Sequence, residues 1–254
     1  MKNKPKILRL LLLCLIPALT GFVLRFFLYR TGFDEKGILS SSNPLHLICC
    51  ALVPAAALWL VLQLKSMKKR DFRPGNAAGV CRILGGIAAG GLMACSAVSL
   101  LLAGGNALAM VRALLAAAAA LSMPLSVYAP REWKIPRLAG RALITLYFVL
   151  DMLARYQVWS GNPQLPDYVF HVPALVCLSL CSYHRLAFCT GIGKRKAHVF
   201  FSLMALVLCV MAMIGPESKV FYLAGALWAG AGMCTLTPPA YPNKQTAEIQ
   251  EETP

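Results

Sequence analysis

The sequence predicts an all-α fold, a polytopic membrane helix bundle of about eight transmembrane helices. The chain is 58% hydrophobic and 14% charged, whereas apolar residues make up about 45–50% of an ordinary soluble domain. Apolar stretches of spanning length recur along it, and Lys and Arg fall in almost every second gap between them. Together these observations exclude a soluble globular protein.

The predicted spans follow from length, because a helix needs about 20 apolar residues to cross about 30 Å of hydrocarbon. The later stretches are shorter or more polar than the earlier ones. The expected spans are Leu10–Tyr29, Leu45–Leu64, Ile83–Ala103, Leu108–Tyr128, Ala142–Trp159, Tyr168–Tyr183, Val199–Ile214 and Val220–Leu236.

The orientation follows from the positive-inside rule. Basic residues precede the first span and fill the gaps after the second, fourth and sixth. Three of the alternate gaps together contain one basic residue, Lys219. The exception is the first outer loop, where Arg30 and Lys36 accompany Asp34 and Glu35. This distribution of basic residues predicts that both termini face the cytosol. Because the loops are compact, we also expect the protein to lie in the plasma membrane of a bacterial cell.

The net charge of +15 is spread through short connectors. A nucleic-acid-binding domain would instead gather its basic residues into a stripe, so no nucleic-acid partner is expected. The expected partner of these residues is the lipid bilayer, through anionic headgroups at its cytoplasmic face.

One transmembrane domain is expected over residues 1–238, followed by a disordered cytoplasmic tail over 239–254 that is polar and acidic. An internal repeat is a second hypothesis: Asn43-Pro44 precedes Val53-Pro54-Ala55 at the same spacing as Asn162-Pro163 precedes Val172-Pro173-Ala174. It would divide the chain into four-helix halves, 1–128 and 129–238. The alternative is coincidence, because the chain has 16 prolines and the first and fifth spans do not align at this offset.

The fifth span carries the candidate site. Tyr147, Asp151, Arg155 and Trp159 recur every four residues and so share one helix face. Asp151 lies about 13 Å beyond Ala142 along the axis, near mid-membrane, and Arg155 about 6 Å farther out. A central Asp costs about 3 kcal/mol to insert, so this face should turn into the bundle. It is either a binding or proton-relay site or an i,i+4 ion pair that fixes one helix.

Three more cations are expected near the same outer level: Arg25, Arg112 and His171. With Arg155 they could form a site for an anionic small molecule. The alternative is that Arg25 and Arg112 extend toward the outer headgroups, as long basic side chains near helix ends often do.

No metal and no cofactor are expected. Cys177, Cys181 and His184 share a helix face, but a closed zinc site needs a fourth ligand and none is indicated. The remaining intramembrane cysteines are interpreted as reduced packing residues.

Two functions fit these features. One is a small-molecule transporter or permease that uses the polar face of the fifth span; the other is a non-catalytic membrane subunit, sensor or assembly factor, which would have a membrane-protein partner. A membrane enzyme is a third, less favoured interpretation, because no catalytic constellation is evident.

Overall fold

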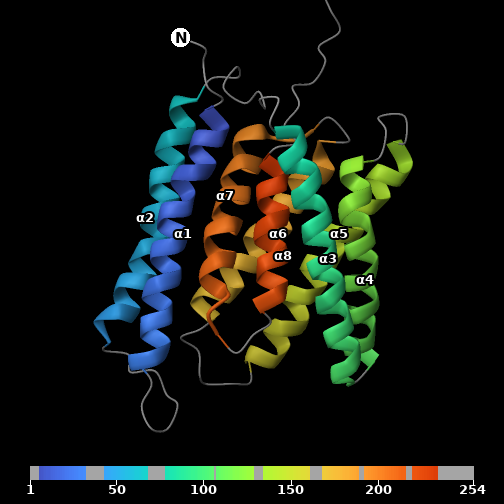
Figure 1. Cartoon of the computed structure of the whole chain (residues 1–254), viewed down its shortest axis with the longest axis horizontal. Coiled ribbons are helices and arrows are strands. Elements are labelled where there is room, and N and C mark those ends of the chain that lie inside the picture. The colour runs from blue at the N-terminus through green and yellow to red at the C-terminus, as the bar shows by residue number, and fades with distance from the viewer. Residues whose placement is uncertain are drawn as a thin grey trace, which may run out of the picture.

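The computed structural model is all-helical in the residues that it describes, which are 6–32, 43–67, 78–105, 107–128, 134–160, 168–188, 192–215 and 219–233 (Figure 1). This confirms the all-α part of the predicted fold class. The helices are α1 (Lys6–Thr31), α2 (Pro44–Ser66), α3 (Ala78–Ala103), α4 (Ala107–Tyr128), α5 (Lys134–Ser160), α6 (Tyr168–Ala187), α7 (Arg195–Ala212) and α8 (Lys219–Met233).

Each predicted span coincides with one helix, but some boundaries differ. The helix α5 begins at Lys134 and not near Ala142. Pro136 does not prevent this earlier start, because it falls within the first turn, where a missing N–H is tolerated. Likewise, α6 continues past Tyr183 to Ala187. The predicted tail lies outside the described residues.

Six helices are long and apolar enough to cross a membrane: α1, α2, α3, α4, α6 and α7. The helix α5 is not among them because it carries five charged residues. The helix α8 is not among them because its described part, of 15 residues, is too short. The six apolar helices are compatible with a multi-pass membrane protein. The count of eight spans remains a prediction.

The surface of the helices is apolar in the way that lipid contact requires. Large side chains such as Ile16, Leu102 and Leu121 are exposed over the outer faces of α1, α3 and α4. A soluble monomer rarely exposes apolar patches of this extent. The surface therefore agrees with the composition in indicating a lipid environment.

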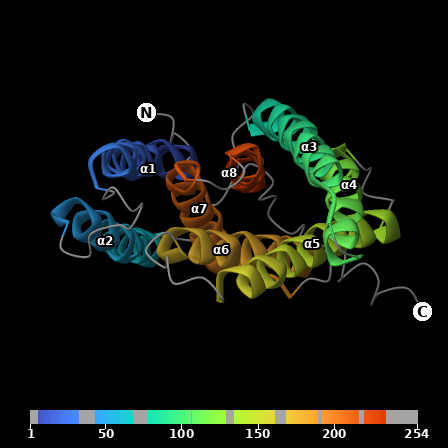
Figure 2. The same cartoon turned by 90° about the horizontal axis from the view of Figure 1, so that it is seen from below.

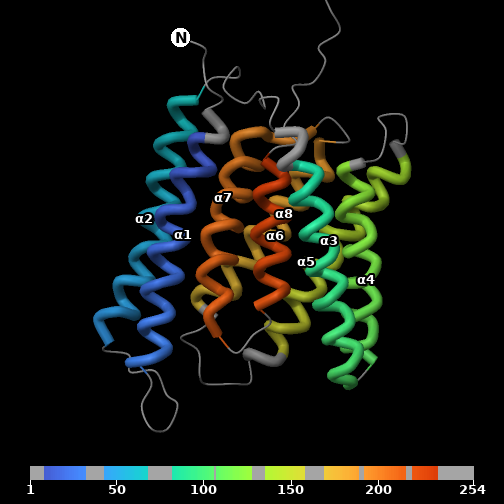
Figure 3. The backbone as a smooth tube through the Cα atoms, in the orientation of Figure 1, coloured from blue at the N-terminus to red at the C-terminus, as the bar shows by residue number. Residues whose placement is uncertain are grey.

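Successive helices run in opposite directions (Figure 3). The first residues of α1, α3, α5 and α7 consequently lie at one end of the bundle, as do the last residues of α2, α4, α6 and α8. The described basic residues at this end include Arg9, Arg82, Arg137 and Arg195, each near the start of α1, α3, α5 or α7. Which side of the membrane it faces remains a prediction.

The helices form a central group flanked by two pairs (Figure 2). The pair α1 and α2 packs on α7, and the pair α3 and α4 packs on α8 and α5. The first four helices thus lie in two pairs on opposite sides of α5–α8. Asn43 caps α2 by accepting a hydrogen bond from the Leu45 N–H at 3.0 Å, whereas Asn162 lies outside the described residues. The internal repeat stays a prediction.

Glycines allow α3 and α4 to approach each other closely. A methyl group added at Gly90 would lie 2.8 Å from the Ala120 carbonyl oxygen and 2.8 Å from Cδ of Pro124. The Ala120 carbonyl belongs to the helix backbone and cannot move aside. Nothing lies within 4 Å of the same position at Gly91.

We therefore expect Gly90→Ala to lower stability by about 1–3 kcal/mol through overpacking. In contrast, Gly91→Ala should be neutral or stabilising by up to about 1 kcal/mol, because alanine favours the helix. Thermal unfolding of both variants in detergent provides the measurement. Equal unfolding temperatures for the two variants would contradict the close approach.

Candidate functional site

The polar face of α5 lies inside the bundle, because α4 and α6 pack against this helix on either side. Asp151 is fully buried, with 0% of its surface exposed. It is also the sole acidic residue among the described residues. A buried charge must be paired, so its partners define the site.

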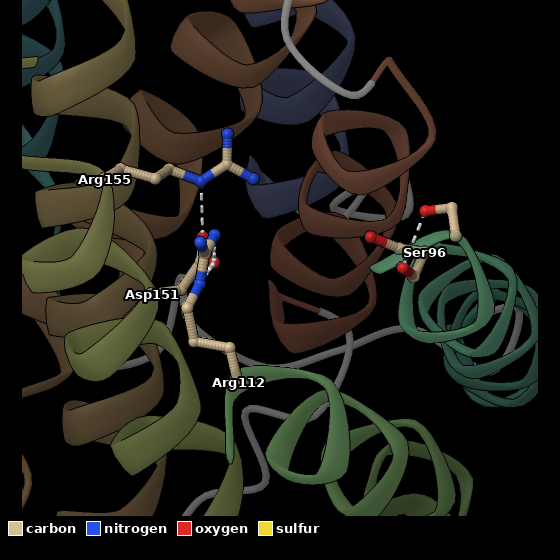
Figure 4. A network of polar contacts seen from close by, with 5 residues as sticks. Ser96, Arg112, Asp151 and Arg155 are labelled. Atoms are coloured by element: carbon tan, nitrogen blue, oxygen red, sulfur yellow. Dashed lines mark hydrogen bonds and ion pairs between the residues drawn. The ribbon is translucent and has the colours of Figure 1, made fainter. Parts of the chain in front are cut away.

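Two arginines bind Asp151 (Figure 4). Arg112 of α4 donates from Nη2 to Oδ1 at 2.6 Å and from Nε to the same oxygen at 3.2 Å. Arg155 of α5 donates from Nε to Oδ2 at 2.7 Å. We call Arg112, Asp151 and Arg155 the charged network. It joins α4 to α5 and confirms the ion pair predicted from the four-residue spacing.

Each carboxylate oxygen of Asp151 is therefore taken by a different arginine. With two guanidinium groups and one carboxylate, the network carries a formal charge of +1. The network is thus an anchor for negative charge inside an apolar bundle.

Tyr147 lies one turn before Asp151 and is also buried, with 1% of its surface exposed. Its hydroxyl has no hydrogen-bond partner among the described residues. It lies within electrostatic range of Asp151, Arg155 and Arg112. The side chain of Trp159, the fourth residue of the predicted stripe, lies outside the described part of the structure.

Aromatic rings of α8 cover the far side of Arg155. The Cζ atom of Arg155 lies 4.7 Å from the ring centroid of Phe221 and 5.7 Å from that of Tyr222. Both aromatic rings therefore contribute cation–π attraction to Arg155. The Tyr222 hydroxyl lies 2.8 Å from Nδ1 of His171 on α6. His171 is therefore connected to the charged network through Tyr222.

Arg25 lies apart from the charged network. It is fully buried between α1, α6 and α7, donates from Nη1 to the Met211 carbonyl oxygen at 3.0 Å, and stacks on Phe170 at 4.5 Å. It lies within electrostatic range of His171. Neither Arg25 nor Arg112 reaches out to headgroups, because the first is enclosed and the second binds Asp151. The structure thus brings Arg112 and Arg155 together, with His171 and then Arg25 beyond them.

A second group of buried basic residues, Arg141, Arg185 and His198, lies outside the sites expected from the sequence. Arg185 falls in the gap after the predicted span Tyr168–Tyr183, yet it lies in α6 with 2% of its surface exposed and stacks on Trp228 at 3.6 Å. Arg141 donates to the Arg185 carbonyl oxygen at 2.8 Å, and the buried His198 lies 3.4 Å from the Gly232 carbonyl oxygen. The available clue was Trp228, a large aromatic residue in the later part of α8, which consists mostly of Ala and Gly.

The cysteines and histidine of α6 contact packing partners. Cys181 Sγ lies 3.1 Å from the Ser202 hydroxyl, and the His184 ring stacks on Phe201 with centroids 5.7 Å apart. Within the described helices, no three His, Cys, Asp or Glu side chains are placed to hold a metal ion.

The chemistry available at the charged network is electrostatic recognition. The network offers guanidinium donors, and the hydroxyl of Tyr147 lies one helix turn away. With a single carboxylate in the described helices, a pair of acids for general acid–base work cannot be assembled from them. Comparison with known proteins gives no match to a family model, to a curated protein or to a solved structure.

Proposed function

We propose that this chain is a multi-pass plasma-membrane permease for a small molecule, which binds at the charged network. The observation that carries the proposal is the burial of Asp151 between Arg112 and Arg155 inside a helix bundle with an apolar exterior. Charges within membrane segments are costly and usually mark the path of a solute or ion.

The position of the network supports this role. It lies where α4 meets α5, and Phe221 and Tyr222 extend it to α8. A solute held there contacts several helices at once, so small movements between helices can change its access to the two membrane faces. In this proposal both termini face the cytosol.

Reconstituted liposomes on a solid-supported membrane test the proposal. Rapid addition of sodium phosphate, sodium acetate or sodium chloride should produce a transient current in wild-type liposomes for at least one salt. Arg155→Gln should abolish it, and Arg30→Gln, which removes an exposed arginine of α1, should retain it. Absence of current for all three salts, or an equal current from Arg155→Gln, counts against the permease.

A non-catalytic membrane subunit, sensor or assembly factor is the second candidate. The observation in its favour is that both oxygens of the fully buried Asp151 are already bound, as in an ion pair that fixes helices together. Purification from native membranes in a gentle detergent distinguishes the two. A partner recovered in fixed ratio favours the subunit, and a single species favours the permease.

A further inference from the structure

The surroundings of Asp151 are those of a bound oxyanion. Its two oxygens receive hydrogen bonds from guanidinium groups on two helices. Arginine is the side chain best suited to bind carboxylate and phosphate, because its planar donors match their oxygens. Arg112 and Arg155 thus present to Asp151 the kind of donors that bind a free oxyanion.

The Tyr147 hydroxyl is the second observation. It is buried beside the charged network and has no hydrogen-bond partner among the described residues. A buried hydroxyl without a partner is unfavourable. An oxygen atom of a ligand bound to the arginines would give this hydroxyl an acceptor.

The third observation concerns access. The Arg112 side chain is 16% exposed, whereas that of Asp151 is fully buried. Because Arg112 binds Oδ1 and Arg155 binds Oδ2, a ligand can replace the carboxylate on Arg112 while Asp151 keeps its bond to Arg155.

We infer that Asp151 is an internal stand-in for a small oxyanion ligand, a carboxylate or phosphate group, that Arg112 and Tyr147 bind when the Asp151 carboxylate releases Arg112. This deepens the proposed permease by naming the chemical class of its solute. It also gives Asp151 a distinctive role, because the aspartate competes with the ligand and does not contact it favourably.

The sign of one substitution tests this role. Asp151→Asn removes the competing charge and keeps the side-chain size, so inorganic phosphate should bind about tenfold more tightly or better than to the wild type. An affinity of Asp151→Asn for phosphate that is no higher than that of the wild type would overturn this role. The measurement is the rise in unfolding temperature with phosphate, at constant ionic strength set by chloride, in a neutral detergent.

Further variants keep the test decisive if Asp151→Asn is recovered in low yield. Arg112→Gln and Tyr147→Phe should each reduce the phosphate-dependent rise of an otherwise wild-type chain, and the control Arg30→Gln should not. Retention of the full rise in both variants, or no rise in either the wild type or Asp151→Asn, overturns the inference.

Two sources of phosphate are separated by a second arm without free phosphate. Micelles containing phosphatidylglycerol are compared with micelles containing phosphatidylcholine. A rise specific to phosphatidylglycerol that Arg112→Gln abolishes assigns the site to a lipid headgroup, and a rise with inorganic phosphate assigns it to a soluble solute. Phosphate binding without any current identifies an anion site in a protein that is not a permease. Current without anion binding retains the permease and rejects the oxyanion.

Discussion

Asp151→Ala is expected to lower the free energy of unfolding by about 3–5 kcal/mol, the usual cost of removing one member of a buried ion pair. Arg112 and Arg155 would then lose their shared carboxylate, and the two positive charges would remain close together inside the bundle. Such a loss is a large fraction of the stability of most folded proteins. The measurement is the fraction of monodisperse protein that survives heating in detergent with chloride as the sole anion.

An apolar replacement of the whole charged network separates its contribution to stability from its contribution to anion binding. Replacing all three members, as Arg112→Met, Asp151→Leu and Arg155→Met, should recover stability to within about 1 kcal/mol of the wild type or better, because apolar residues often replace a buried ion triad without loss. The same protein should show no phosphate-dependent rise in unfolding temperature. A triple variant that remains as unstable as Asp151→Ala would show that packing at these positions, and not charge pairing, dominates.

Arg25→Ala is expected to have the second largest effect, about 3 kcal/mol of destabilisation. The substitution leaves a cavity beside Phe170 and removes the hydrogen bond to the Met211 carbonyl oxygen at the end of α7. It also removes the cation–π contact that links α1 to α6. Chemical unfolding in detergent should show a lower midpoint.

Arg30 provides the matched control on the same helix. It too stacks on an aromatic ring, with 4.7 Å between its Cζ and the Phe26 centroid, but it is exposed. Exposed contacts of this kind contribute about 0.5–1 kcal/mol. Arg30→Ala should therefore shift the midpoint much less than Arg25→Ala. A similar shift for both would contradict the assignment of the Arg25 effect to burial.

The contacts within the site that the sequence predicted are those between residues of one helix. The spacing of Asp151 and Arg155 fixes their relative position in any helix, and the insertion cost fixes which way the pair must face. The structure accordingly contains the predicted ion pair. The locations of the helices followed from apolar length for the same reason, since hydrophobicity is local information.

Contacts between helices were beyond sequence reasoning. The pairing of Arg112 with Asp151 depends on how α4 rotates against α5, which no spacing in one segment determines. The burial of Arg25 and Arg185 could not be predicted either. Their charges suggested headgroups or loops, yet aromatic rings from other helices enclose both. Cation–π partners distant in sequence left no pattern that marked these arginines as interior.

The aromatic rings of α8 bear on biogenesis. Phe221 and Tyr222 cover Arg155, and Trp228 covers Arg185, so the aromatic contacts of these arginines can form only after the ribosome has delivered a helix that follows both. During this interval α3 and α7 also lack the neighbour that α8 provides. A nascent chain therefore completes the packing around Arg155 and Arg185 only when α8 joins the bundle.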